Sequence, residues 1–395
     1  MQTTERLYYR DCYLREFEAD VLAAEPEGKA FRVYLDRSAF YPDSGGQPSD
    51  HGMIAGIPVL NVLDDGERVA HIMERPPAGR RVNAQIDWAR RFDHMQQHTG
   101  QHILSAAFEQ IDNYVTASFH LGSTTSTIDL DSDRLGRRQL EEAEELANRI
   151  IFEDREVHIL FKTTAEASQM SLRKPTEQEG EVRVIEIPEF DLSACGGTHV
   201  NRTGAVGTVL VRKFERLKGL TRVEFVCGRR ALAAARNDFE ILSEAARLFS
   251  GAAENLPALI SKQSEELKAA LKAREKLIKR VAEYFAVELH AAAPEVKGRK
   301  VVRRIFAAED AEEAKSVAHA LARQPATVAL VGVQGKPALL IFAQTAGGAS
   351  DIGSILKQTV AKVGGKGGGA RDFAQGGGVD ATRLEEALTL AESLL

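Results

Sequence analysis

Two short motifs combine side chains of the types that bind a metal ion. His98 and His102 lie four positions apart, and so do Cys195 and His199 much later in the chain. Three imidazoles and one thiolate form a ligand set that a tetrahedral zinc ion accepts. One such pair alone is weak evidence, because histidines at this spacing are common on helix surfaces. In a chain with only 3 cysteines and 10 histidines, the coincidence of both pairs predicts a zinc site made of these four residues.

Each pair lies in a local sequence that would hold it in place. Residues 96–108 contain no proline, and their apolar side chains recur at helical spacing. This pattern predicts a helix with His98 and His102 on one face. Two glycines lie between Cys195 and His199, so we expect a sharp turn that aims both side chains at one point.

The predicted site differs from that of a metalloprotease. In the HExxH motif the residue after the first histidine is a glutamate that acts as general base, and here that residue is Thr99. Zinc can orient a substrate, polarise a carbonyl or activate water, and the sequence leaves these roles open. His94 and His120 lie nearby, but hydrogen-bonding or surface roles fit them better than that of a base. The catalytic residue is therefore left unassigned.

The composition is that of an ordinary soluble protein. Of the 395 residues, 44% are hydrophobic and 27% are charged, and no run is long and apolar enough to span a membrane. Cys12 and Cys227 are expected to be buried or incidental thiols. The sequence starts without a secretory signal, so we expect a cytoplasmic protein with reduced cysteines.

The charge pattern leaves the type of partner open. A net charge of -6 disfavours nucleic-acid binding by the chain as a whole, because phosphate contacts need lysine and arginine. From residue 291 onward, however, 13 basic residues accompany 11 acidic ones, against 38 and 46 before it. The basic cluster at 297–304 can be explained equally well as a solvated strand edge.

Hydrophobic periodicity divides the chain into four parts. Residues 1–90 combine short alternating runs with turn signals, which indicates a β-rich domain, and residues 91–230 alternate helical and strand-like runs. Residues 231–292 predict a long helix or a helical hairpin. This part would serve as a spacer, form an oligomer interface, or pack on its own domain. Residues 293–395 alternate strands and helices around a glycine-rich loop, as in a compact α/β domain.

Several segments follow one another in the order of a known family. They are residues 40–48, 93–104, 119–122, 184–188, 193–200 and 222–228. These segments resemble the editing domain of alanyl-tRNA synthetase and its free-standing AlaX form, and residues 364–378 are similar to the DHH-associated domain that closes full synthetases.

The resemblance implies a fold of the α+β class with four parts. They are a β-rich, barrel-like domain at 1–90, an α/β zinc-containing editing domain at 91–230, a helical spacer at 231–292 and a small α/β DHH-associated domain at 293–395.

The resemblance also implies an activity. Members of this family hydrolyse the ester that joins a wrong amino acid to tRNA, so we expect a trans-editing deacylase of mischarged alanine-accepting tRNA. A pocket shaped for alanine admits glycine and discriminates weakly against serine, which is why a second site is needed. The family's amino-acid pocket corresponds to Ser38, Ser44, Gly45, Gly46 and Gln47. Ser38 stands where the family has threonine, and Ser44 replaces the first glycine of a triplet.

The glycine-rich loop is assigned to tRNA binding by resemblance. It lacks the GxxxxGK[ST] spacing of a nucleotide-binding loop, whereas its amides and two cations can approach a phosphate chain closely. The residues concerned are Lys366, Gly367, Gly368, Gly369 and Arg371. A flexible linker is the alternative interpretation. We also expect a homodimer formed through the helical spacer or the C-terminal domain.

Other functions fit the sequence less well. A non-catalytic zinc RNA-binding module would need only four protein ligands that leave no open position on the metal. A fragment-like relative of alanyl-tRNA synthetase would share the same motifs. A full synthetase is disfavoured because residues 1–90 are too few for an aminoacylation domain. A DHH phosphoesterase is disfavoured because residues 93–95 lack the acidic metal cluster that its chemistry needs.

Overall fold

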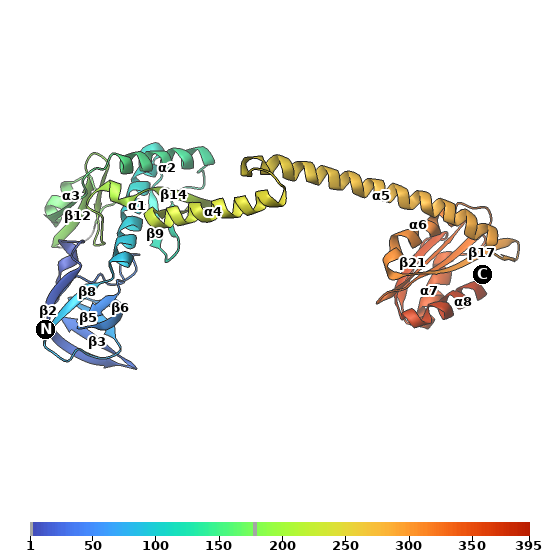
Figure 1. Cartoon of the computed structure of the whole chain (residues 1–395), viewed down its shortest axis with the longest axis horizontal. Helices are drawn as coiled ribbons and strands as arrows, with labels where there is room; N and C mark the ends of the chain where they lie inside the picture. Colours follow the sequence, from blue (N-terminus) through green and yellow to red (C-terminus); the bar gives the residue numbers. More distant parts are fainter. Residues whose placement is uncertain (1–2, 177–179) are drawn as a thin grey trace. The chain divides into compact units, whose positions relative to one another are not determined.

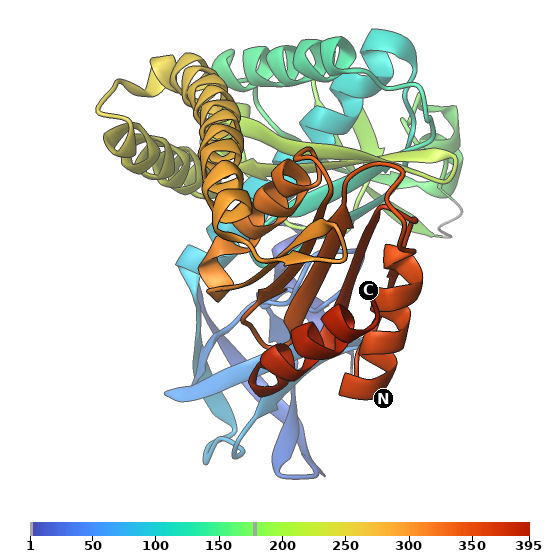
Figure 2. The same ribbon diagram turned by 90° about the vertical axis from the view of Figure 1, so that its right-hand side faces the viewer.

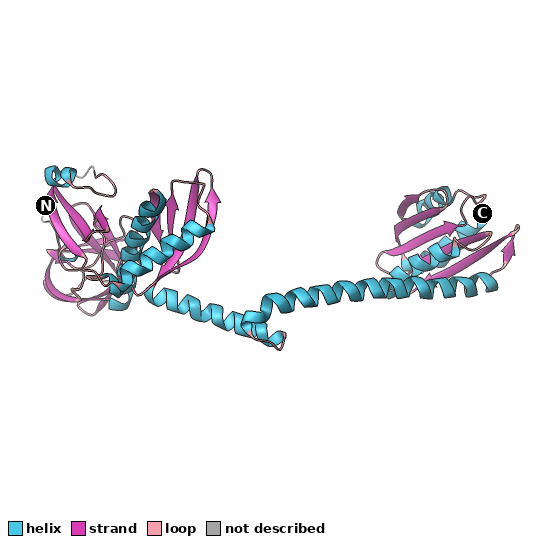
Figure 3. Ribbon diagram, turned by 90° about the horizontal axis from the view of Figure 1, so that it is seen from above, coloured by secondary structure: helices cyan, strands magenta, loops and turns pink. Residues whose placement is uncertain are grey.

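The computed structural model describes residues 3–176 and 180–395. Residues 1–2 of the expected 1–90 domain and residues 177–179 of the 91–230 domain lie outside the described part. The chain is a mixture of helices and strands, as predicted (Figure 3). It divides into two compact units, Met1–Glu244 and Ala245–Leu395. No helix in the described ranges combines the length and the apolar character that crossing a bilayer requires.

Six strands of the first unit close into an antiparallel barrel (Figure 1). Their order around the barrel is β2 (Glu16–Glu27), β3 (Ala30–Leu35), β7 (Arg68–Met73), β6 (Ile57–Asp65), β5 (Gly52–Ile54) and β8 (Arg81–Ile86). Exposed and buried residues alternate strictly along β8, so Val82, Ala84 and Ile86 join the apolar core of the barrel. Two further short strands, β1 (Glu5–Arg6) and β4 (Arg37–Ser38), pair with each other in parallel.

Helix α1 (Trp88–Asp112) follows the last barrel strand. The Asp87 side chain accepts a hydrogen bond from the Arg90 N–H and caps the first turn, and Asn113 ends the helix in the left-handed conformation. Every residue from 94 to 108 is buried. The helix is longer than the predicted 96–108 because many of its buried residues are polar and hydrogen-bonded, so the apolar spacing marks only part of it.

Arg91 joins the start of α1 to the barrel. Its side chain is fully buried, and its Nε donates to both carboxylate oxygens of Asp50 at 3.0 Å. Its two terminal nitrogens donate to the carbonyl oxygens of Cys12 and Ala39. A buried charge satisfied in this way is tolerated, whereas removal of one partner would be strongly destabilising. The hydrogen bonds of Arg91 therefore hold the start of α1 in a fixed orientation on the barrel.

Two antiparallel sheets accompany α1 in the rest of this unit. The larger has the order β14 (Val209–Leu217), β15 (Leu220–Cys227), β10 (Ser126–Leu130) and β9 (Thr116–Leu121). The smaller has the order β11 (His158–Thr163), β12 (Glu181–Ile187) and β13 (Asp191–Ala194). Helix α2 (Arg137–Phe152) packs on α1, and α3 (Thr164–Gln169) packs on the smaller sheet. One apolar core joins α1, α2 and strands of both sheets.

The second unit is a six-stranded sheet with helices on both faces (Figure 2). Its order is β16 (Glu295–Val296), β17 (Arg299–Phe306), β18 (Thr327–Val333), β19 (Ala338–Gln344), β21 (Phe373–Val379) and β20 (Lys366–Gly369). Alternate strand residues form separate cores with two pairs of helices, so the pairs cover opposite faces. The pairs are α5 (Leu256–Ala292) with α6 (Ala311–Leu321), and α7 (Ile352–Val363) with α8 (Leu384–Ser393).

The predicted helical part consists of two α-helices, α4 (Gly228–Leu248) and α5, joined by residues 249–255, which include the short 3-10 helix η3 (Ala253–Asn255). Near its C-terminal end α5 buries Ala282 and Ala286 in a core that it shares with α6. Residues 261–277 of the same helix are exposed. One end of α5 is thus packed on its own domain, as one of the alternative interpretations held.

The prediction of a loop in the glycine-rich segment is wrong. Residues Lys366–Gly369 and Phe373–Val379 are β20 and β21, which pair in antiparallel fashion at the edge of the sheet. The two strands approach so closely that a Cβ atom on Gly367 would lie 2.5 Å from the Cα of Gly376. Glycine here permits close packing of backbones, and the sequence pattern does not distinguish this from flexibility.

Candidate metal centre

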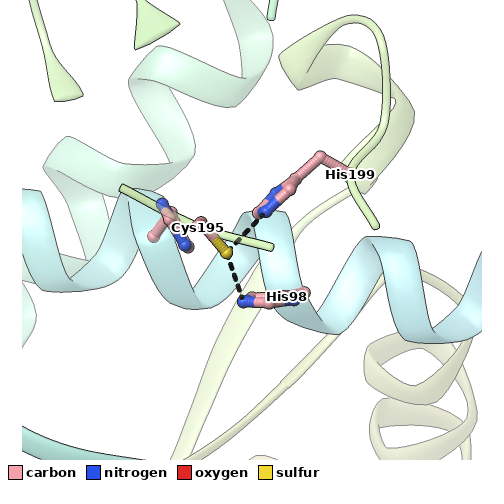
Figure 4. Close-up of side chains that lie close together, drawn as sticks. His98, Cys195 and His199 are labelled. Carbon is pink, nitrogen blue, oxygen red and sulfur yellow. Dashed lines mark hydrogen bonds between the residues drawn. The ribbon is translucent and has the colours of Figure 1, made fainter. Parts of the chain in front are cut away.

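The four predicted ligands come together in the first unit. His98, His102, Cys195 and His199 each offer one ligand atom, and these atoms all lie within 4.8 Å of one another. Figure 4 shows His98 and His199 directed at the Cys195 sulfur. The sulfur lies 3.5 Å from His98 Nε2 and 3.3 Å from His199 Nε2. The three histidines are buried and the cysteine is half-buried, so the cluster is largely shielded from water.

Two different elements supply the ligands. His98 and His102 lie one turn apart on α1, as predicted, and the other two lie in the turn after β13. A Cβ atom on Gly197 would lie 2.1 Å from His98 Cε1, so glycine is needed there for close approach. A Cβ atom on Gly196, by contrast, would have its nearest neighbour 3.5 Å away. The two glycines therefore have different roles, which their spacing did not reveal.

A second group holds the Nδ1 atom of each histidine ligand. His98 Nδ1 lies 2.8 Å from the Gln47 side-chain oxygen, and His102 Nδ1 lies 2.9 Å from an Asp191 carboxylate oxygen. His199 Nδ1 lies 3.1 Å from the Thr99 hydroxyl. These contacts favour protonated Nδ1 atoms and leave all three Nε2 atoms free to face the sulfur, which is the arrangement that histidine ligands of a metal adopt. The residues therefore fit a zinc ion with three nitrogen ligands and one sulfur ligand.

The charges around Cys195 favour its metal-binding form. Burial by itself would raise the pKa of the thiol, but the neighbouring His98 and His199 side chains and a hydrogen bond with His102 outweigh burial. The pKa of Cys195 consequently lies well below its usual value. A lowered pKa favours the thiolate, which is the form that binds metal ions.

The glycine motif, which consists of Ser44, Gly45, Gly46 and Gln47, lies beside this centre. Ser44 and Gln47 form a tight turn, in which the Gln47 N–H donates to the Ser44 carbonyl oxygen at 3.0 Å. The carbonyl oxygen of Gly46 accepts a hydrogen bond of 3.0 Å from the Leu121 N–H of β9. Gly45 and Gly46 have φ angles of +56° and +81°, which glycine adopts without strain. Four of the five predicted pocket residues are thus joined to the metal centre through Gln47.

Ser38, the fifth, is fully buried within the first unit. Its hydroxyl lies 2.8 Å from His71 Nε2 and accepts a hydrogen bond of 3.1 Å from the Phe40 N–H. Its predicted contact with the amino acid stays a prediction. The residues predicted to bind tRNA lie on β20 and in the turn after it, and all except the half-buried Gly368 are exposed.

Several residues of the site were not predicted from the sequence. Asp191 and Thr99 position two of the histidine ligands, and Arg183 donates to the carbonyl oxygens of Cys195 and Gly197 at 2.6 and 2.9 Å. Thr99 lies inside the first histidine motif, whereas the sequence does not mark Asp191 or Arg183 as neighbours of these side chains before folding. The other nearby histidines differ: His120 is exposed, whereas His94 is buried and its Nδ1 has no hydrogen-bond partner among the described residues.

Comparisons with known families match two regions of the chain. Residues 182–224 match the family described as threonyl and alanyl tRNA synthetase second additional domain. Residues 296–395 match the DHHA1 domain. The first region contains Cys195 and His199, and the second contains the glycine-rich strands.

Whole-chain comparisons find relatives of two kinds. The chain is 33% identical to an alanine–tRNA ligase of Pyrococcus abyssi, over 99% of this chain and 44% of the ligase. It is 31% identical to the alanyl-tRNA editing protein AlaX-L of Pyrococcus horikoshii, over 94% of both chains. The chain therefore spans about half the length of the ligase and nearly the whole length of the editing protein.

Among solved structures, the C-Ala domain from Aquifex aeolicus alanyl-tRNA synthetase matches 26% of this chain and 96% of that domain. The two are 22% identical in the matched region, with a TM-score of 0.24.

Proposed function

Because this chain belongs to the AlaX family of alanyl-tRNA editing proteins, we propose that it hydrolyses mischarged alanine-accepting tRNA in trans. The substrate is the ester of serine or glycine, and the products are the free amino acid and tRNA. The observation that carries the proposal is the largely buried cluster of three imidazoles and one cysteine sulfur. Half of this cluster lies in the region matched by the synthetase additional domain.

The chain's own residues prepare the site for this reaction. Hydrolysis breaks the bond between the ester carbonyl and the ribose oxygen, and water supplies the new carboxyl oxygen. When bound by His98, His102, Cys195 and His199, zinc would orient the ester, polarise its carbonyl or activate water. Four protein ligands close a tetrahedral sphere, which favours orientation. The largely buried setting strengthens every electrostatic interaction with the ester.

Activity on three substrates tests the proposal. The purified protein should release serine or glycine from alanine-accepting tRNA much faster than alanine, and a Cys195→Ala, His199→Ala double variant should lose both bound zinc and activity. Zinc is measured by elemental analysis and expected at about one ion per chain. Undiminished zinc in the double variant would refute the ligand assignment. Full zinc without hydrolysis of any of the three esters would favour the alternative, a non-catalytic RNA-binding module.

Serine differs from glycine by a side-chain hydroxyl. We propose that Ser38 and the glycine motif (Ser44, Gly45, Gly46 and Gln47) form the pocket that binds this hydroxyl. If Ser38 contacts the substrate, Ser38→Ala should slow serine release about tenfold, since a lost partner costs roughly 1–3 kcal/mol. Glycine release should change much less. The ratio of the two rates is decisive, because Ser38 also contacts His71 and Phe40, and damage to these contacts would lower both rates equally.

The remaining assignments concern tRNA and assembly. We propose that Lys366, Gly367, Gly368, Gly369 and Arg371 contact the tRNA backbone, and that the four parts predicted from the sequence act as barrel, editing, spacer and tRNA-binding domains. The exposed apolar side chains of α5, which include Leu267 and Leu271, are consistent with a homodimer through the helical part. A cytoplasmic location follows from the proposed substrate.

A further inference from the structure

Asp191 and Arg173 form an ion pair directly behind one ligand of the metal centre. Asp191 Oδ2 lies 2.9 Å from His102 Nδ1, and Oδ1 lies 2.7 Å from Arg173 Nε. The Ser193 hydroxyl donates to the same carboxylate at 3.0 Å. The carboxylate is fully buried, and the arginine side chain is 15% exposed. Both oxygens of Asp191 are thus held in fixed directions.

The other two histidine ligands have neutral partners. His98 Nδ1 contacts the amide of Gln47, and His199 Nδ1 contacts the hydroxyl of Thr99. Among the described contacts of the three ligands, the one at His102 is therefore the one that carries a full negative charge. A carboxylate behind a ligating imidazole fixes its tautomer and makes its other nitrogen a stronger donor.

Arg173 moderates this charge. It lies in the segment between α3 and β12, and its backbone N–H also donates to the Leu192 carbonyl oxygen at 2.8 Å. Its guanidinium competes with His102 for the same carboxylate, so it withdraws part of the negative charge from the imidazole.

We propose that Asp191 is a positioning residue that sets the tautomer and donor strength of His102, and that Arg173 attenuates it. This inference rests on the metal centre of the proposed function. It makes the two partners of one ion pair act in opposite directions on metal binding. A purely structural ion pair would instead make both substitutions weaken the site through the same loss of order.

Zinc affinity, measured by competition with a chelator on the full-length chain, tests this difference in sign. Asp191→Asn should weaken binding about 10- to 100-fold, the usual effect of losing such a partner. Arg173→Gln should bind zinc as tightly as the wild type or more tightly. Glu189→Gln is the matched control, because Glu189 is exposed and lines the same cavity of about 570 Å³ as Asp191 and Arg173. It should leave the affinity unchanged.

Two further measurements keep the test decisive. Cobalt in place of zinc should show a changed visible spectrum in Asp191→Asn, since the geometry at His102 is altered. If Asp191→Asn fails to fold, the Asp191→Asn, Arg173→Gln double variant removes both charges and should still bind zinc weakly. Equal affinity of Asp191→Asn and wild type, or equal losses in both single variants, would overturn the inference. Failure of the wild type to bind zinc would overturn the metal centre itself.

Discussion

Gln47 joins three segments that the sequence keeps far apart. Its side-chain oxygen accepts from His98 Nδ1 at 2.8 Å and from the Thr198 N–H at 3.1 Å, and its amide nitrogen donates to the Thr198 hydroxyl at 2.9 Å. The residue is fully buried. The glycine motif, α1 and the turn after β13 therefore share one hydrogen-bonded side chain. Any displacement of the motif is transmitted to a metal ligand through it.

His71 is held in a neutral state inside the first unit. Its Nδ1 lies 2.9 Å from the Val33 carbonyl oxygen, which can only accept, so the proton is on Nδ1. Its Nε2 then accepts from the Ser38 hydroxyl at 2.8 Å. Burial lowers the pKa of His71 to about 4, and the hydrogen bond to Val33 opposes burial only in part.

This depressed pKa predicts a loss of stability in mild acid. Between about pH 6.5 and the pKa of about 4, the unfolded chain binds a proton that the folded chain does not. Above about pH 6.5 the contribution of His71 to the free energy of unfolding is therefore fully present. As the pH falls to 5, the free energy of unfolding decreases by about 2 kcal/mol because of this residue. Urea unfolding at pH 7.5 and 5 should show this fall, and His71→Gln should reduce it. An identical fall in the variant would show that other groups cause it.

How far the site could be predicted depended on the kind of residue. The four side-chain types are chemically distinctive, so His98 and Cys195 could be singled out as candidate ligands from type and spacing alone. Asp191 could not, because an aspartate four residues before a cysteine has no special signal until folding places it behind His102. Gly197 was recognised, but for its flexibility; its close contact with His98 depends on tertiary structure.

At the scale of elements, local periodicity identified the middle of α1 and the mixture of helices and strands. The helix predicted at 96–108 lies inside α1, and residues 91–230, where helical and strand-like runs alternate, contain both kinds of element. The ends of α1 were missed because buried, hydrogen-bonded polar residues interrupt the apolar pattern. The glycine-rich strands β20 and β21 were missed because glycine carries no side chain that could show strand alternation.

The turn after β13 provides a matched pair of substitutions. Gly197→Ala would place a methyl group 2.1 Å from His98 Cε1, so His98 must move and the site must distort. We expect zinc affinity to fall at least about tenfold, together with activity. Gly196→Ala would find its nearest neighbour, the Tyr9 hydroxyl, at 3.5 Å, which is ordinary contact. It should retain zinc and activity.

Zinc titration and thermal unfolding of the two variants check this prediction. Unfolding separates a distorted site from a protein that is destabilised everywhere. If Gly196→Ala impairs zinc binding as much as Gly197→Ala, the turn needs glycine for its backbone conformation and not for access of His98 to the sulfur.

At the scale of the whole molecule, the metal centre and the glycine-rich strands belong to different units. All four ligands lie in Met1–Glu244, and β20 lies in Ala245–Leu395. Each unit has apolar cores of its own. This division predicts that the chemistry and much of the tRNA affinity can be separated.

A chain that ends at Leu248, the last residue of α4, tests this separation. It loses the exposed cations Lys366 and Arg371 but keeps every residue of the metal centre. We expect KM for mischarged tRNA to rise about tenfold, because backbone contacts are lost, while kcat changes less than about twofold. Full-length Lys366→Ala, Arg371→Ala should raise KM in the same direction and weaken the salt dependence of tRNA binding, since each phosphate contact contributes to that dependence. Equal tRNA affinity of the shortened and full-length chains, measured at one salt concentration, would contradict the assignment of tRNA binding to the second unit.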